Sequence, residues 1–186
     1  MVDPINTRGL SSPQIRKWVC QYIAEDLHPH RVLDLGCGIG LYGATVRVMH
    51  REKAEGIDFI GVDGFLPYLM QETARGYYRS LIWAKIEDVI NGVIKVKADL
   101  TICMDVIEHF EKYAAMAILK MSGKMIISTP LFNLKQGEIA GNKLEEHQCW
   151  FTERELNGLG FRTLCKFDYV QDDGQHGPIG AFERRK

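Results

Sequence analysis

Short apolar runs recur along this chain and are separated by stretches with helical patterning. The alternation of strand and helix patterns is typical of a parallel sheet covered on both faces. The last two runs have no room for a helix between them, and Asp172-Asp173-Gly174 is a hairpin turn signal, so the final strand is expected to be antiparallel to its neighbours. The runs expected to form strands are 31–35, 58–62, 80–84, 99–104, 123–128, 161–170 and 178–184.

A helix is expected before the first of these strands. Ser12 and Pro13 are typical of a helix N-cap and first turn. Ile15 and Val19 then fall on one apolar stripe, and the helix should end near Leu27.

The first strand runs into a turn with three alternating glycines, Gly36, Gly38 and Gly40. Glycines at a strand-to-helix turn allow backbone amides to approach a ligand closely. Asp34 lies just before them, where it would repel the pyrophosphate of a dinucleotide and attract an ammonium group. This pattern favours S-adenosylmethionine, with Cys37 inside the turn close to it.

Five blocks of the sequence resemble the class I S-adenosylmethionine-dependent methyltransferases, beginning with the glycine turn as motif I. The similarity spans about residues 13 to 185, and the blocks are 31–40, 59–64, 98–110, 123–130 and 147–161. The resemblance implies an α/β fold with a Rossmann-like, mostly parallel seven-stranded sheet, in the order 3-2-1-4-5-7-6 with strand 7 antiparallel and helices on both faces.

The resemblance also implies cofactor contacts after the second strand. Asp63 would accept both ribose hydroxyls beside Gly64, and Phe65 would lie over one adenine face. A structural alternative is that Asp63 or Gly64 caps the next helix, because Pro67 stands near its start.

After the third strand the sequence departs from the family pattern. Lys85 stands where the family usually has an acid that contacts the adenine amino group. Glu87 or the backbone of Ile86 is the substitute expected for this contact.

Asp105, Glu108 and His109 follow the fourth strand with spacing that would place them on one helical face. In one interpretation Asp105 contacts the methionine end of the cofactor and His109 is a general base. In a second, the three side chains and His147 hold a divalent ion, an arrangement that resembles the Glu-x-x-Glu-His motif of small-RNA 2′-O-methyltransferases and quinone-biosynthesis O-methyltransferases. In a third, the acids complement the helix dipole and His109 packs. We expect His109 and His147 to be catalytic and no metal to be bound.

Residues 131–150 are longer than a strand-to-helix link requires, and long connections are usually functional or mobile. We predict that they form an acceptor-side lid together with the N-terminal helix region, 1–29. A rigid dimer contact and a disordered surface loop are the alternatives.

Composition limits the class of protein. A chain of 186 residues with 46% apolar content suits one domain over 1–186. The formal net charge of −1 gives no strong nucleic-acid signal. The five cysteines form no CxxC pair, which suits a reduced compartment, and no leader or membrane span is evident, so a cytoplasmic location is expected.

The expected function is methyl transfer from S-adenosylmethionine to a small-molecule O or N acceptor. The stretch from Gly38 to Gly43 also matches GxGxxG, which leaves an NAD(P)-dependent oxidoreductase as an alternative. A catalytically silent cofactor-binding or scaffold protein with the same fold is the other alternative. The oligomeric state is not predicted.

Overall fold

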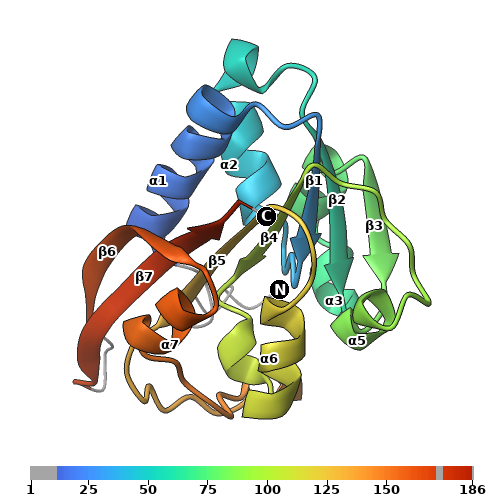
Figure 1. Cartoon of the computed structure of the whole chain (residues 1–186). Coiled ribbons are helices and arrows are strands. Elements are labelled where there is room, and N and C mark those ends of the chain that lie inside the picture. Colours follow the sequence, from blue (N-terminus) through green and yellow to red (C-terminus); the bar gives the residue numbers. More distant parts are fainter. Residues whose placement is uncertain (1–11, 171–173, 186) are drawn as a thin grey trace.

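A single mixed sheet organises the computed structural model, which describes residues 12–170 and 174–185 (Figure 1). The strand order is β3-β2-β1-β4-β5-β7-β6, as predicted from the family resemblance. The strands are β1 (Arg31–Leu35), β2 (Asp58–Asp63), β3 (Ser80–Trp83), β4 (Leu100–Met104), β5 (Met125–Pro130), β6 (Arg162–Val170) and β7 (His176–Arg184).

Strand β7 is antiparallel to both β5 and β6, whereas β1 to β5 pair in parallel. The predicted direction of the last strand is therefore confirmed. Of the predicted hairpin turn, residues 172 and 173 lie outside the described residues, and Gly174 has φ +86°. The parallel strands bring their carboxyl ends to one edge of the sheet, which is where open α/β sheets bind ligands.

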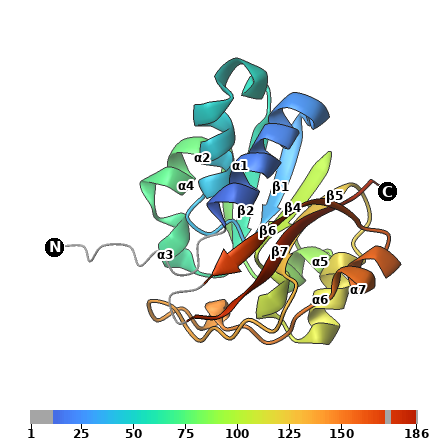
Figure 2. The ribbon, with the colours of Figure 1, turned by 90° about the vertical axis from the view of Figure 1, so that its left-hand side faces the viewer.

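Helices cover both faces of the sheet (Figure 2). On one face lie α1 (Pro13–Tyr22), α2 (Leu41–Met49), α3 (Leu66–Leu69) and α4 (Glu72–Tyr77). On the other lie α5 (Ile86–Ile90), α6 (Lys112–Leu119) and α7 (Glu153–Gly158). Shorter helical turns are η1 (Ile23–Leu27), η2 (Arg51–Ala54), η3 (Ile107–His109) and η4 (Lys143–Glu145). No helix within the described ranges is long and apolar enough to cross a membrane.

Helix α1 begins as predicted. The Ser12 hydroxyl accepts a hydrogen bond from the backbone N–H of Ile15 at 3.5 Å, and Pro13 occupies the first turn. The α-helix ends at Tyr22 and continues as the π-helical turn η1, which stops at His28 in the left-handed conformation.

The core lies on both sides of the sheet, which explains the nearly continuous apolar runs of the central strands. Phe59 and Ile102 pack under α1 and α2, whereas Phe151 and Phe182 pack on the opposite face, and all four are fully buried. Each such side chain contributes about 1.5–3 kcal/mol to folding. The rigid sheet therefore fixes the positions of the loops at its carboxyl edge.

Candidate active site

The glycine turn after β1 holds Gly36, Gly38 and Gly40 at positive φ, 71°, 53° and 83°. A Cβ on Gly36 would lie 2.5 Å from Val106 Cγ2, and one on Gly40 would lie 2.6 Å from Ala74 Cα. A Cβ on Gly38 would meet no atom within 4 Å. Packing thus explains the first and third glycines, and Gly38 is the position of the three where a ligand can approach the backbone.

Asp63, at the end of β2, joins the second strand to this turn. Its Oδ2 accepts a hydrogen bond from the Gly38 N–H at 2.8 Å, and its Oδ1 accepts one from the Phe65 N–H at 2.8 Å. Burial raises the pKa of Asp63, while these two amide bonds lower it. The alternative that Asp63 or Gly64 caps the next helix is wrong, because Phe65 is the N-cap of α3 and no side chain caps that helix; the bond from Asp63 to Phe65 closes the turn before it. Each carboxylate oxygen has a further lone pair, so the ribose contact stays a prediction.

Asp34 lies beneath the turn and is 1% exposed. Its Oδ2 accepts a hydrogen bond from the Tyr78 hydroxyl, which itself accepts one from the Gly43 N–H. Burial raises the pKa of Asp34 to about 7. Cys37 is also buried, and its sulfur packs where a Cβ on Gly61 would lie. Contact of Asp34 with an ammonium group, and of Cys37 with a ligand, therefore stay predictions.

The residues expected around adenine lie at the ends of β2 and β3. Gly64 follows Asp63, and the Phe65 ring packs edge-on against Tyr68 with centroids 4.9 Å apart. Ile86 begins α5 with a buried side chain, and Glu87 is exposed in the first turn of that helix. Contact of the base with the Ile86 backbone or with Glu87 stays a prediction.

The prediction that Asp105, Glu108 and His109 lie on one face of a helix is wrong. Asp105 has φ +55°, Val106 is not helical, and the helical turn η3 spans only Ile107–His109. The Asp105 N–H donates to the Ser128 carbonyl at 3.0 Å, and the Ser128 hydroxyl donates to Asp105 Oδ1 at 2.7 Å. These bonds hold Asp105 against β5, so a regular helix cannot begin there.

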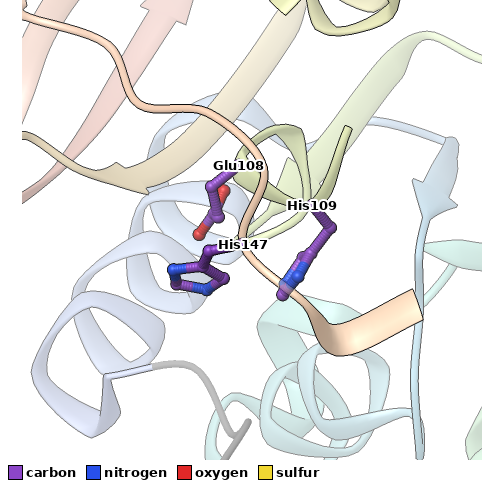
Figure 3. A group of neighbouring side chains, drawn as sticks. All are labelled: Glu108, His109 and His147. Atoms are coloured by element: carbon purple, nitrogen blue, oxygen red, sulfur yellow. The ribbon is translucent and has the colours of Figure 1, made fainter. Parts of the chain in front are cut away.

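Three side chains do come together at this edge of the sheet: Glu108, His109 and His147 (Figure 3). Nitrogen or carboxylate oxygen atoms from all three lie within 4.8 Å of one another. The two imidazoles pack edge-on with centroids 4.8 Å apart, and Glu108 is 2% exposed with the Thr129 hydroxyl donating to its Oε2 at 3.2 Å. The cluster thus contains three of the four side chains of the divalent-ion interpretation, and Asp105 is not among them.

Hydrogen bonding defines the tautomers of both histidines. His109 Nε2 lies 3.1 Å from the Asp105 carbonyl, and His147 Nδ1 lies 3.0 Å from the Leu134 carbonyl. Each nitrogen must donate to its carbonyl, so the other ring nitrogen of the neutral imidazole carries the lone pair. For His109 this is Nδ1, which is buried without a hydrogen-bond partner among the described residues.

Burial controls the charges of the cluster. It lowers the pKa of His109 to about 4, with a further lowering by His147, and it also lowers the pKa of His147. Burial, followed by the charge of Asp105, raises the pKa of Glu108 well above its usual range. Both imidazoles are therefore neutral near pH 7 and able to accept a proton or bind a cation.

A cavity of about 40 Å³ adjoins the cluster. Asp105, Glu108, His109 and His147 line it together with Ser12, Leu134 and Gln136, which lie in the two segments expected on the acceptor side, and with three residues not expected there: Pro130, Tyr169 and Ile179. The last three come from β5, β6 and β7. No local motif signals such residues, because only the pairing of β5, β6 and β7 brings them to the site.

Comparison with known proteins identifies the family of this chain. Residues 11–162 match the sequence profile of a family described as a methyltransferase domain. The chain belongs to this family of methyltransferases, and its fold is that of the class I S-adenosylmethionine-dependent enzymes. A search of curated proteins found no match.

Several solved structures share the fold. The N-terminal domain of EvdMO1, crystallised with S-adenosylhomocysteine (SAH) and D-fucose, has a TM-score of 0.62 at 16% identity, covering 95% of this chain and 85% of that one. Magnesium protoporphyrin IX methyltransferase from Synechocystis PCC 6803 with bound SAM has a TM-score of 0.59 at 15% identity, covering 92% and 78%. The methyltransferase domain of the bacterial protein CtHen1-C has a TM-score of 0.54 at 18% identity, covering 93% and 98%.

Proposed function

We propose that this protein transfers a methyl group from S-adenosylmethionine to an oxygen or nitrogen atom of a small-molecule acceptor. The observation that carries the proposal is the open backbone at Gly38, joined by a hydrogen bond to Asp63 and facing the same sheet edge as the histidine cluster. These residues fit an adenosine-containing ligand, because the open space over Gly38 lets it approach the backbone and the Asp63 carboxylate can accept hydrogen bonds from its hydroxyls. Gly36, Gly40 and Cys37 shape the turn, and Asp105 would lie by the methionine end.

The bound sulfonium supplies an activated methyl group, so the protein mainly has to align the acceptor and exclude water. We assign proton acceptance to His109, because its Nδ1 carries the lone pair and its half-buried ring is neutral. His147 supports it by packing against the ring, with its own Nε2 available toward the acceptor.

A second candidate is that Glu108, His109 and His147 hold a divalent cation that orients the acceptor. The proximity of the three groups favours it. A cation would also offset the cost of a buried Glu108 carboxylate beside Asp105. In this case His109 Nδ1 and His147 Nε2 are the nitrogen ligands, and neither acts as a base.

Ligand-induced stabilisation tests the cofactor assignment. At about 100 times its dissociation constant, SAH should add roughly 2.7 kcal/mol to the free energy of unfolding, which a melting experiment detects. NAD(H) and NADP(H) are the comparison ligands. Stabilisation by the dinucleotides and none by SAH would overturn the assignment in favour of an oxidoreductase.

Turnover tests the activity. Methyl transfer to a panel of phenols, carboxylates, sugars and amines is measured with and without a chelator. Loss of turnover with chelator and its return with Mg²⁺ or Mn²⁺ would select the cation over the general base. Tight SAH binding without turnover of any acceptor would favour the silent cofactor-binding alternative.

A further inference from the structure

The turn η4 of the 131–150 segment lies directly on the end of β2. A Cβ built on Gly64 would be 2.9 Å from Leu144 Cδ1, so the leucine side chain fills the space over that glycine. Leu144 is nevertheless 56% exposed. An apolar side chain that is more than half exposed gains little from folding, which means that this contact is weak and easily broken.

Polar contacts hold the same turn in place beside Leu144. Asn142 is 3% exposed, its Oδ1 accepts a hydrogen bond from the Leu144 N–H at 3.0 Å, and its Nδ2 lies 3.4 Å from Glu145 Oε1. The Glu145 carboxyl also hydrogen-bonds with the hydroxyl of Tyr68 in α3, close to Asp63. The turn thus contacts Gly64, which lies between Asp63, expected at the ribose, and Phe65, expected at the base.

A planar base cannot share this position with the leucine. A ring between Gly64 and Leu144 needs about 3.5 Å of clearance on each side, and the two residues are already in contact. The acceptor side is closed as well, because the cavity of about 40 Å³ beside His147 is far smaller than the roughly 300 Å³ of an ordinary small-molecule site.

One segment closes both sides. His147 follows η4 after a single residue, its N–H donates to the Gln136 carbonyl at 3.0 Å, and the Gln136 side chain donates to the Glu145 carbonyl at 2.8 Å. These bonds join the two ends of the segment 136–147, so it moves as one unit. Displacement of η4 from Gly64 therefore also moves His147 relative to His109.

We propose that residues 136–147 are an autoinhibitory latch, in which Leu144 occupies the position of the cofactor base and must be displaced before S-adenosylmethionine binds. This inference rests on the proposed function. Only molecules with an open latch can bind the cofactor, so the apparent affinity equals the intrinsic affinity multiplied by the open fraction. The loss of affinity appears as a lower association rate constant. Weakening the latch should therefore speed cofactor association and leave dissociation unchanged.

Binding kinetics of SAH test the latch. Leu144→Ala should raise the association rate constant about three- to fivefold with an unchanged dissociation rate constant. Lys143→Ala, an exposed neighbour in the same turn, is the matched control and should match the wild-type protein. Faster dissociation of Leu144→Ala would show that the leucine is a roof over bound cofactor, and unchanged kinetics would show that the contact is irrelevant to binding. Either result overturns the proposal.

A second variant and a second measurement guard against misfolding. Asn142→Ala loosens the turn without touching Gly64 and should change the association rate in the same direction, in protein whose melting is still cooperative. Hydrogen exchange of the amides in 142–146 should speed up on addition of SAH, whereas slower exchange would contradict the latch. Absence of SAH binding by the wild-type protein would instead overturn the proposed function itself.

Discussion

The hydroxyl of Tyr78 donates a hydrogen bond of 2.5 Å to Oδ2 of Asp34, although the two residues are 44 positions apart in the sequence. Asp34 lies in β1 and Tyr78 follows α4, so this bond joins the first strand to the helical layer beneath the glycine turn. Both side chains are buried, and the same hydroxyl accepts the N–H of Gly43 in α2. The pair therefore supports the turn from below.

Tyr78→Phe should lower the free energy of unfolding by about 1–3 kcal/mol, because it leaves the buried Asp34 carboxyl and the Gly43 N–H without this partner. Chemical denaturation measures the change. Tyr113→Phe, at a side chain that is 87% exposed, is the control and should be neutral. Equal stability of the two variants would mean that the hydroxyl contributes nothing to the fold.

Asp34→Asn tests the charge of the buried carboxyl. Burial raises its pKa from 3.8 to about 7, so the protonated form is favoured in the folded state. The protonated Asp34 carboxyl contributes fully to the free energy of unfolding below about pH 4, and this contribution is lost as the pH rises through about 7. The free energy of unfolding of Asp34→Asn, relative to that of the wild type, should therefore rise by on the order of 3–4 kcal/mol from pH 4 to pH 8.

Denaturation of wild type and variant across this pH range measures the difference. Asp26→Asn, at the surface, is the control for a lost aspartate. A constant difference between Asp34→Asn and wild type from pH 4 to pH 8 would show that Asp34 is ionised throughout in the folded protein.

Gly38→Val should abolish SAH binding while the fold survives, because the added branches enter the open space through which the ligand approaches the backbone. Gly56→Val is a matched control: it also has positive φ, 80°, and no neighbour within 4 Å of its Cβ, but it lies before β2 at the opposite edge of the sheet. Calorimetric titration with SAH compares them. Retained binding by folded Gly38→Val would place the ligand elsewhere.

Substitution of His109 tests the catalytic cluster. If His109 is the base, activity at pH 5.5 should stay close to that at pH 7, because burial lowers its pKa to about 4 and the ring stays neutral. His109→Ala should then lose most of the rate at both pH values with SAH affinity unchanged. Initial-rate measurements with and without chelator check this, and full activity of the variant would leave only a packing role.

The sheet could be predicted from the sequence because its central strands are buried on both faces. Their apolar runs, together with the turn signals between them, indicate the strands without any tertiary contact, and residues 31–35 match β1 in full. The glycine turn and Asp63 at the end of β2 could be predicted for a related reason. Gly36, Gly38 and Gly40 have backbone conformations that favour glycine, and these are local properties.

Tertiary structure decided the rest. The spacing of Asp105 and His109 suggested a helix, but reciprocal hydrogen bonds between Asp105 and Ser128 on the neighbouring strand hold Asp105 in the left-handed conformation and leave room for a single short helical turn. The meeting of Glu108 with His147, and of Leu144 with Gly64, depends on how a long connection folds back over the strand ends. Such contacts join residues far apart in the sequence, and no local periodicity carries information about which of them will form.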